Sequence, residues 1–119
     1  METSLSSLRK EVSRFRDDRD WLKFHNPKDL SVAISIEAAE LLELFLWKDK
    51  QTAESVMRNR KQLQSVEEEM ADVAIYLLSL SDILEIDLAE AITKKLRDNA
   101  LKYPVSKSKG KADKYNELN

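Results

Sequence analysis

Cysteine is absent from this chain, and turn-forming residues are nearly absent, since the 119 residues include one glycine and two prolines. Without cysteine there can be no disulfide, no zinc–thiolate site and no cysteine nucleophile. β-Sandwiches and β-barrels need frequent turns, so the scarcity of glycine and proline argues against an all-β fold. Leu, Glu, Lys, Ala and Arg dominate instead, and all of them favour helices. The sequence therefore predicts an all-α fold.

An excess of positive charge is also lacking, because 20 Lys and Arg face 22 Asp and Glu, a formal net charge of −2. This balance is not that of a nucleic-acid binder, so no nucleic-acid partner is expected. The first residues, METSLSSLRKEVSRF, lack the basic and apolar regions of a secretion signal. The apolar segments are short for a bilayer or interrupted by carboxylates. The expected location is cytoplasmic, with no membrane partner.

Four helices follow from the spacing of apolar residues and from the capping signals. Leu5, Leu8, Val12 and Phe15 recur at helical spacing, and Asn26-Pro27 is a typical N-cap and first-turn pair. The predicted helices span about residues 4–19, 26–48, 53–84 and 87–102. We expect one helical domain over residues 1–104 and a polar, Lys-rich tail over residues 105–119.

Two of these helices are apolar around most of their circumference. The segment SVAISIEAAELLELFLW, residues 31–47, carries three glutamates and no positive charge. Between residues 70 and 84 the only charged residues are Asp72 and Asp82. Helices of this kind must be covered on several sides. Because one chain of four helices can hardly cover both, we expect a homo-oligomer.

The carboxylates of these helices are spaced so that they can converge. Glu37 and Glu40 are three residues apart and share a helix face, and Glu69 and Asp72 have the same spacing. If the two helices pack side by side, four carboxylates meet, which is unfavourable unless their charge is compensated. Neither apolar stretch contains Lys or Arg to do so. A hard divalent cation, Mg²⁺ or Mn²⁺, is the natural counter-charge.

These acids also have more ordinary interpretations. A single ExxE pair is more often solvated surface, and the run EEE at residues 67–69 resembles an ordinary polar helix start. The occurrence of two such pairs within apolar helices favours a metal site. A ferritin-like di-iron site would need two ExxH motifs, but the one histidine, His25, lies outside both helices. A carboxylate-only site leaves the Mg²⁺ shell partly open, which points to a phosphate ligand and to phosphoryl or nucleotidyl chemistry. With no P-loop, an ordinary kinase or ATPase is not expected.

The stretches IEAAELLELFLWK and EEEMADVAIYLLSLS together resemble the all-α, MazG-like nucleoside triphosphate pyrophosphohydrolases, which carry an ExxE and then an ExxD motif. The similarity is greatest to the dCTP pyrophosphatase branch, because RDWLKFHNPKDL and KLRDNALKYP also fall at matching positions. The resemblance covers roughly residues 15–104. Many members have two adjacent acids opening the first motif, whereas Ile36 precedes Glu37 here, which leaves the number of metals open.

The resemblance implies a Mg²⁺-dependent enzyme that cleaves a nucleoside triphosphate, dCTP or a related pyrimidine nucleotide, to the monophosphate and pyrophosphate. Its metal ligands and catalytic residues would be Glu37, Glu40, Glu69 and Asp72, with Glu40 chosen as the base. Its substrate contacts would be Trp21, His25, Trp47, Tyr76, Lys95 and Asn99. Without the resemblance, ordinary core packing is the favoured interpretation of the aromatic residues.

The resemblance further implies a tetramer built as a dimer of dimers. Two alternatives remain open from the sequence. One is a non-catalytic helical interaction module that retains the fold, and the other is a hydrolase of diphosphate or phosphoribosyl substrates.

Overall fold

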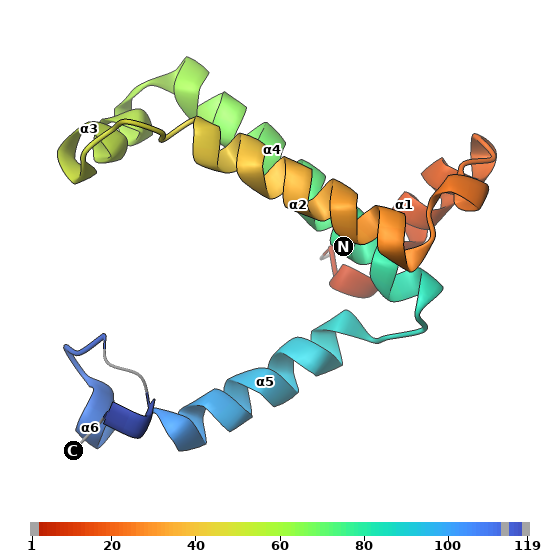
Figure 1. Ribbon diagram of the computed structural model, residues 1–119. Helices are drawn as coiled ribbons and strands as arrows, with labels where there is room; N and C mark the ends of the chain where they lie inside the picture. The colour runs from red at the N-terminus through yellow and green to blue at the C-terminus, as the bar shows by residue number, and fades with distance from the viewer. Residues whose placement is uncertain (1–2, 113–114, 118–119) are drawn as a thin grey trace. The chain divides into compact units, whose positions relative to one another are not determined.

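The computed structural model describes residues 3–112 and 115–117, and these residues contain helices and turns but no strand (Figure 1). The prediction of an all-α fold is confirmed. The chain divides into two compact units, Met1–Ile86 and Asp87–Asn119. The first contains α1 (Leu5–Asp18), η1 (Leu22–Phe24), α2 (Pro27–Glu43), α3 (Lys50–Glu54), η2 (Ser55–Arg58) and α4 (Arg60–Ile83). The second contains α5 (Leu88–Lys102), α6 (Val105–Ser108) and η3 (Tyr115–Glu117).

Each long helix begins at a side chain that accepts a hydrogen bond from a free backbone N–H of the first turn. At α2, the Asn26 side chain accepts from the backbone N–H of Asp29 at 2.9 Å, and Pro27 occupies the first helical position. The caps of the other three long helices are Ser4, Asn59 and Asp87. The predicted starts of the first, second and fourth helices are thereby confirmed.

In the first unit, α2 lies alongside α4, and α1 packs against the C-terminal half of α4 (Figure 1). The two long helices run antiparallel, because His25, just before α2, contacts Ser79 while Glu37 lies beside Glu69. The buried apolar residues are Leu30 of α2, Val56 of η2 and Leu78 of α4. This pairing fixes which residues of the two helices face each other.

The helix α1 differs from expectation in the residue that it buries. Its apolar stripe is only partly covered, and Phe15 is 51% exposed. The most buried residue of α1 is Arg16, at 4% exposure, which forms ion pairs with Asp17 and Asp82. A buried guanidinium is tolerated because its N–H groups find acceptors.

Two predicted helix boundaries are wrong. The second helix ends at Glu43 and not near Lys48, because the backbone tightens into i→i+3 hydrogen bonds such as Phe45 N–H to the Leu42 carbonyl, 2.9 Å. The chain then leaves the helix at Trp47, whose φ of 65° is incompatible with helix continuation. The third helix begins at Arg60, since Asn59 caps it and interrupts the polar stretch before it.

The second unit follows the sequence prediction over its main helix. The fourth predicted helix ends at Lys102, before Pro104, as expected. The predicted tail contains the one-turn helix α6 and the turn η3, while residues 113–114 and 118–119 lie outside the described residues. The predicted domain boundary at residue 104 stays a prediction.

Large apolar side chains are exposed on both units, including Leu42 (64%) on α2 and Leu101 (83%) on α5. None of the helices that the structure describes combines the length and hydropathy that a membrane crossing requires.

Candidate active site

Three carboxylates of the predicted site converge between α2 and α4. Glu37 and Glu40 come from α2 and Glu69 from α4, and one oxygen of each lies within 4.8 Å of the others. The three-residue spacing puts the two α2 glutamates on one face, and the antiparallel pairing brings α4 to that face. The expected convergence of the ExxE pair with the third glutamate is thus seen in the structure.

The fourth predicted acid, Asp72, lies just outside this group. It belongs to α4, one turn after Glu69, and it is half-buried. It is not among the carboxylates within 4.8 Å of one another. Its charge is nonetheless close enough to raise the pKa of both Glu37 and Glu69.

Two oxygens of the cluster are buried without a hydrogen-bond donor. Among the residues that the structure describes, Oε2 of Glu37 and Oε2 of Glu69 accept no hydrogen bond. No ion pair joins Glu37, Glu40 or Glu69 to a described Lys or Arg. Buried acceptors without donors are uncommon in folded proteins, because their lost hydration is left uncompensated. The arrangement therefore requires a proton or another cation.

The pKa values respond to this crowding. The Glu69 carboxyl, burial and the Glu40 carboxylate together raise the pKa of Glu37 from 4.5 to about 7. The hydrogen bond with Glu37 acts to lower the pKa of Glu69, but burial and the charges of Glu40 and Asp72 outweigh it, so this pKa is also raised. In the absence of a metal, Glu37 and Glu69 share a proton near neutral pH.

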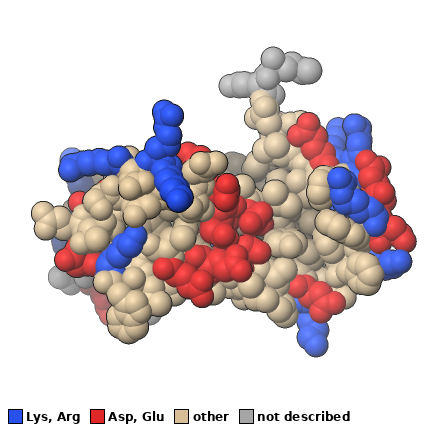
Figure 2. Space-filling model, turned by 90° about the horizontal axis from the view of Figure 1, so that it is seen from above, with Lys and Arg blue, Asp and Glu red and all other residues tan. Residues whose placement is uncertain are grey.

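The cluster fits a divalent cation with oxygen ligands. Hard cations such as Mg²⁺ and Mn²⁺ bind carboxylate oxygens, and a cation would satisfy the buried oxygens of Glu37 and Glu69 while neutralising the repulsion. Figure 2 shows Asp and Glu side chains gathered in one group between wide areas of uncharged surface. An acidic group of this kind attracts cations.

Three of the predicted substrate contacts form a row of aromatic rings at the N-terminal end of α2. The ring centroid of Trp21 lies 6.4 Å from that of His25, and the His25 centroid lies 6.3 Å from that of Tyr76. Trp21 is 42% exposed, while His25 and Tyr76 are half-buried. Because Tyr76 follows Asp72 by one helical turn, the row lies next to the carboxylates.

Trp47 lies at the other end of α2. It is 94% exposed, and its left-handed φ of 65° is unusual for a bulky side chain. The intervening α2 has 17 residues, which corresponds to a length of roughly 25 Å. Within one chain, Trp21 and Trp47 therefore do not face each other.

The remaining two predicted contacts, Lys95 and Asn99, belong to α5 of the second unit. They are four residues apart and share a helix face. Lys95 is exposed and Asn99 is half-buried. Their roles stay predictions.

Sequence reasoning missed a polar network beneath the aromatic row. Arg16 Nη1 donates to Ser79 Oγ at 3.3 Å, Arg16 Nη2 donates to Asp82 at 3.0 Å, and Ser79 Oγ lies 3.3 Å from His25 Nδ1. Burial and the Arg16 charge lower the pKa of His25. Asp82, as one of two charges in an apolar run, was the signal that could have indicated this network.

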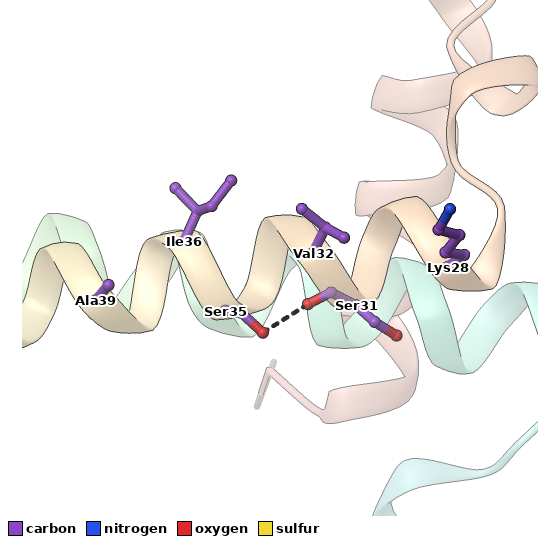
Figure 3. Close-up of a pocket in the computed structure, with 6 residues that line it drawn as sticks. All are labelled: Lys28, Ser31, Val32, Ser35, Ile36 and Ala39. Atoms are coloured by element: carbon purple, nitrogen blue, oxygen red, sulfur yellow. Dashed lines mark hydrogen bonds between the residues drawn. The ribbon is translucent and has the colours of Figure 1, made fainter.

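A shallow groove on α2 lies outside this site. Lys28, Ser31, Val32, Ser35, Ile36 and Ala39 line it. Figure 3 shows Lys28, Val32 and Ile36 projecting from one side of the helix, while Ser35 Oγ donates to the Ser31 carbonyl at 2.9 Å. None of the predicted site residues lines the groove, so it belongs to the exposed apolar surface of α2.

The sequence and fold of this chain are similar to those of known proteins. Residues 32–118 match the MazG-like family. The chain is 37% identical over 117 residues to dCTP pyrophosphatase 1 of Rattus norvegicus, covering 98% of this chain and 69% of the relative. It is 33% identical to dCTP pyrophosphatase 1 of Homo sapiens, with the same coverage. A crystal structure of a pyrophosphatase from Archaeoglobus fulgidus superimposes with a TM-score of 0.78 at 47% identity, covering 87% of this chain and 95% of that one.

The family match covers well over half of the chain, and the full-length similarity to these relatives extends to both units. The carboxylate cluster lies where α2 and α4 carry the ExxE and ExxD motifs. The chain therefore belongs to the MazG-like family, and it is a hydrolase of the nucleotide pyrophosphatase class.

Proposed function

We propose that this chain is a Mg²⁺-dependent pyrophosphohydrolase that converts dCTP or a related pyrimidine triphosphate to the monophosphate and pyrophosphate. Mn²⁺ would substitute for Mg²⁺. Such an activity would remove unwanted nucleotides from the cellular pool, and we place it in the cytoplasm. The names of the curated relatives support the choice of dCTP.

The observation that carries the proposal is that one oxygen of Glu37 and one of Glu69 are buried without a hydrogen-bond donor. Burying acceptors in this way is unfavourable, because each oxygen loses hydration without gaining a hydrogen-bond donor. A helix interface that served only for packing would be better filled with apolar side chains. The cluster is therefore best explained as a cation site that is completed when metal and substrate bind.

The predicted ligands have separate tasks in this scheme. Glu37, Glu69, Glu40 and Asp72 would hold the cation, which supplies charge neutralisation for the triphosphate. Water attacks the α-phosphorus, the bond from that phosphorus to the α,β-bridging oxygen breaks, and pyrophosphate leaves. Glu40 takes the proton of the attacking water. It is chosen because, unlike Glu37 and Glu69, it has no buried oxygen that lacks a hydrogen-bond donor.

The aromatic row is proposed to hold the base and sugar. Flat rings stack on nucleobases with little dependence on sequence, and Trp21 presents an exposed ring. Tyr76, one turn from Asp72, would direct its hydroxyl to the sugar. Lys95 and Asn99 are proposed to contact the substrate phosphates, as the resemblance to the family implies.

Trp47 supports the oligomeric part of the proposal. Its ring is too far along α2 to meet Trp21 around one base in a single chain, and it is almost fully exposed. A second copy that brings Trp47 to the aromatic row would complete the pocket and cover apolar surface at the same time. We propose that the assembly is a tetramer built as a dimer of dimers.

Product analysis with site variants tests the function. Purified protein is incubated with each common nucleoside and deoxynucleoside triphosphate plus Mg²⁺, and products are separated chromatographically. We expect monophosphate and pyrophosphate, with dCTP preferred. Glu40→Gln and Asp72→Asn should abolish turnover and keep the helical circular dichroism. Glu68→Gln, on the same helix as Asp72 but outside the cluster, is the control.

Wild-type turnover in Glu40→Gln or Asp72→Asn would refute the assignment of those residues. Release of inorganic phosphate without pyrophosphate would indicate a different hydrolase. A non-catalytic module is the alternative function, and thermal melting separates it from the enzyme. Ligands that bind the folded state raise the melting temperature, so a panel of nucleotides with Mg²⁺ that causes no shift would favour the module.

A further inference from the structure

The donors and acceptors in the hydrogen-bond network of Arg16, Ser79 and His25 follow from the chemistry of these side chains. Ser79 is the central residue, at 1% exposure, and its Oγ lies 3.3 Å from both Arg16 Nη1 and His25 Nδ1. A hydroxyl has one hydrogen to donate and two lone pairs that accept. The positions of the hydrogens therefore depend on what Arg16 and His25 can offer.

Arg16 settles one half of this network. A guanidinium has N–H donors and no acceptor, so Ser79 Oγ must accept from Arg16. The guanidinium is held in place, because its Nε donates to Asp17 at 2.9 Å and its Nη2 to Asp82 at 3.0 Å. With 4% exposure, Arg16 has little freedom to reorient.

The hydroxyl hydrogen of Ser79 settles the other half. The hydroxyls of Ser31, Ser35, Ser65, Ser81 and Thr93 each donate to a backbone carbonyl of their own helix. Ser79 has no such bond with any residue that the structure describes. A buried hydroxyl hydrogen needs an acceptor, and His25 Nδ1 is the acceptor within reach.

We propose that Arg16 and Ser79 are positioning residues that fix His25 as the tautomer with its hydrogen on Nε2, so that the ring presents a donor to the substrate. Nδ1 accepts from Ser79, and the remaining ring nitrogen, Nε2, has no hydrogen-bond partner among the described residues. The contacts with Trp21 and Tyr76 hold the ring plane.

If the proposed function holds, the hydrogen on His25 Nε2 determines which group of the bound base can pair with it. A donor at Nε2 requires an acceptor on the bound base, and cytosine offers O2 and N3 on its pairing edge. A fixed donor discriminates by leaving the wrong partner unpaired. Burial and the charge of Arg16 lower the pKa of His25, which is consistent with a neutral ring.

Nitrogen NMR tests the tautomer directly, because the chain contains a single histidine. Protein labelled with ¹⁵N-histidine is examined at neutral pH without nucleotide. Protonated and unprotonated ring nitrogens differ widely in chemical shift, and their couplings to the ring protons identify each nitrogen. We expect one tautomer with hydrogen on Nε2. Hydrogen on Nδ1, averaged shifts of two tautomers, or a charged ring would overturn the proposal.

Two serine variants test the cause. Ser79→Ala removes the donor to Nδ1, and we expect its spectrum to show a mixture of tautomers. Ser81→Ala is the matched control, because Ser81 is a buried serine of the same helix whose hydroxyl donates to the Leu78 carbonyl. It should keep the wild-type spectrum. An unchanged spectrum in folded Ser79→Ala would overturn the role of Ser79.

Kinetics with dCTP tests the donor. The side-chain amide of His25→Gln can place a nitrogen near the position of Nε2, whereas that of His25→Asn reaches only the position of Nδ1. We expect KM to rise roughly tenfold in His25→Asn and less in His25→Gln, with kcat changing little in both. The opposite order would overturn the donor role. If wild type hydrolyses no triphosphate, the proposed function fails, while the NMR spectrum still upholds or overturns the tautomer.

Discussion

At the scale of single residues, the fold makes the Glu37 carboxyl harder to ionise than an ordinary glutamate. Its pKa of about 7, raised from 4.5 by Glu69, burial and Glu40, means that the folded metal-free protein holds a proton that the unfolded chain releases. A raised acid pKa stabilises the folded state below the unfolded pKa, and this contribution is lost as pH rises through the folded pKa. The metal-free protein therefore loses stability toward neutral pH.

Urea unfolding in the presence of a chelator measures this loss. Between pH 4.5 and a pH above about 7, the free energy of unfolding of wild type should fall because of Glu37. Glu37→Gln does not titrate and should show a smaller fall over the same range. Glu68→Gln serves as the control and should follow wild type. Parallel curves for wild type and Glu37→Gln would contradict the raised pKa.

The same proton couples metal affinity to pH. A divalent cation must displace the proton that Glu37 and Glu69 share, so its affinity should fall as pH falls below about 7. Calorimetry of Mg²⁺ binding in buffers with different ionisation enthalpies measures the protons released. We expect net proton release near neutral pH. Affinity that is independent of pH, with no proton released, would contradict a cation site on these carboxylates.

Trp47 combines an exposed ring with a backbone conformation that suits glycine. We expect Trp47→Ala and Trp47→Gly to weaken nucleotide binding more than metal binding, because Trp47 is not part of the carboxylate cluster. Trp47→Gly should be more stable than Trp47→Ala by about 1 kcal/mol, since alanine retains the left-handed strain. Calorimetric titrations and urea unfolding measure both effects. Equal loss of metal and nucleotide binding would show that the ring serves only packing.

At the scale of helices, the sequence predicts the features that depend on local spacing. The periods of apolar residues and capping signals such as Asn26-Pro27 predicted three of the four long helix starts. The ExxE spacing placed Glu37 and Glu40 on one face, and the structure brings Glu69 to it. These features are visible because neighbours three or four residues apart determine them.

The features that sequence missed depend on contacts between distant segments or on competing local signals. In the sequence, Arg16 lies beside an apolar stripe and is expected to be exposed. It becomes the most buried residue of α1 because α4 packs against it, with Ser79 of α4 63 positions further along the chain. The early end of α2 has no glycine signal, because Trp47 itself adopts the left-handed conformation. Asn59 was hidden within a run of good helix formers. The position of Asp72 outside the tightest group depends on the exact helix pairing.

The pairing of α2 with α4 holds the carboxylates together and can be tested through its core. Leu30 and Leu78 are 2% and 5% exposed. Leu78→Ala should lower the free energy of unfolding by about 2–5 kcal/mol, because it removes buried apolar atoms and leaves a cavity. Leu42→Ala, at 64% exposure in the single chain, should cost less. Urea unfolding measures the difference, and a similar loss in both variants would mean that the Leu42 face is also buried, in an assembly.

At the scale of the whole molecule, the amount of exposed apolar surface has to be explained. The large apolar residues that are fully buried in the described chain are Leu30, Val56 and Leu78, whereas many more are exposed on α2, α4 and α5. Exposed apolar surface of this kind is what the proposed assembly would cover. In the proposed assembly, a second copy would bring Trp47 to the aromatic row and would also cover the exposed apolar helices.

Mixing a Glu40→Gln chain with a Trp47→Ala chain tests whether a nucleotide is bound by two copies. In the proposed assembly, a Glu40→Gln chain keeps Trp47, and a Trp47→Ala chain keeps Glu40. Co-refolded mixtures should therefore contain sites with both residues intact, and part of the dCTP turnover should return. A mixture of Glu40→Gln with Asp72→Asn is the control, because both substitutions fall in one carboxylate cluster and no mixed site is whole. Recovery in neither mixture, with light scattering showing mixed oligomers, would place Trp47 in the site of its own chain.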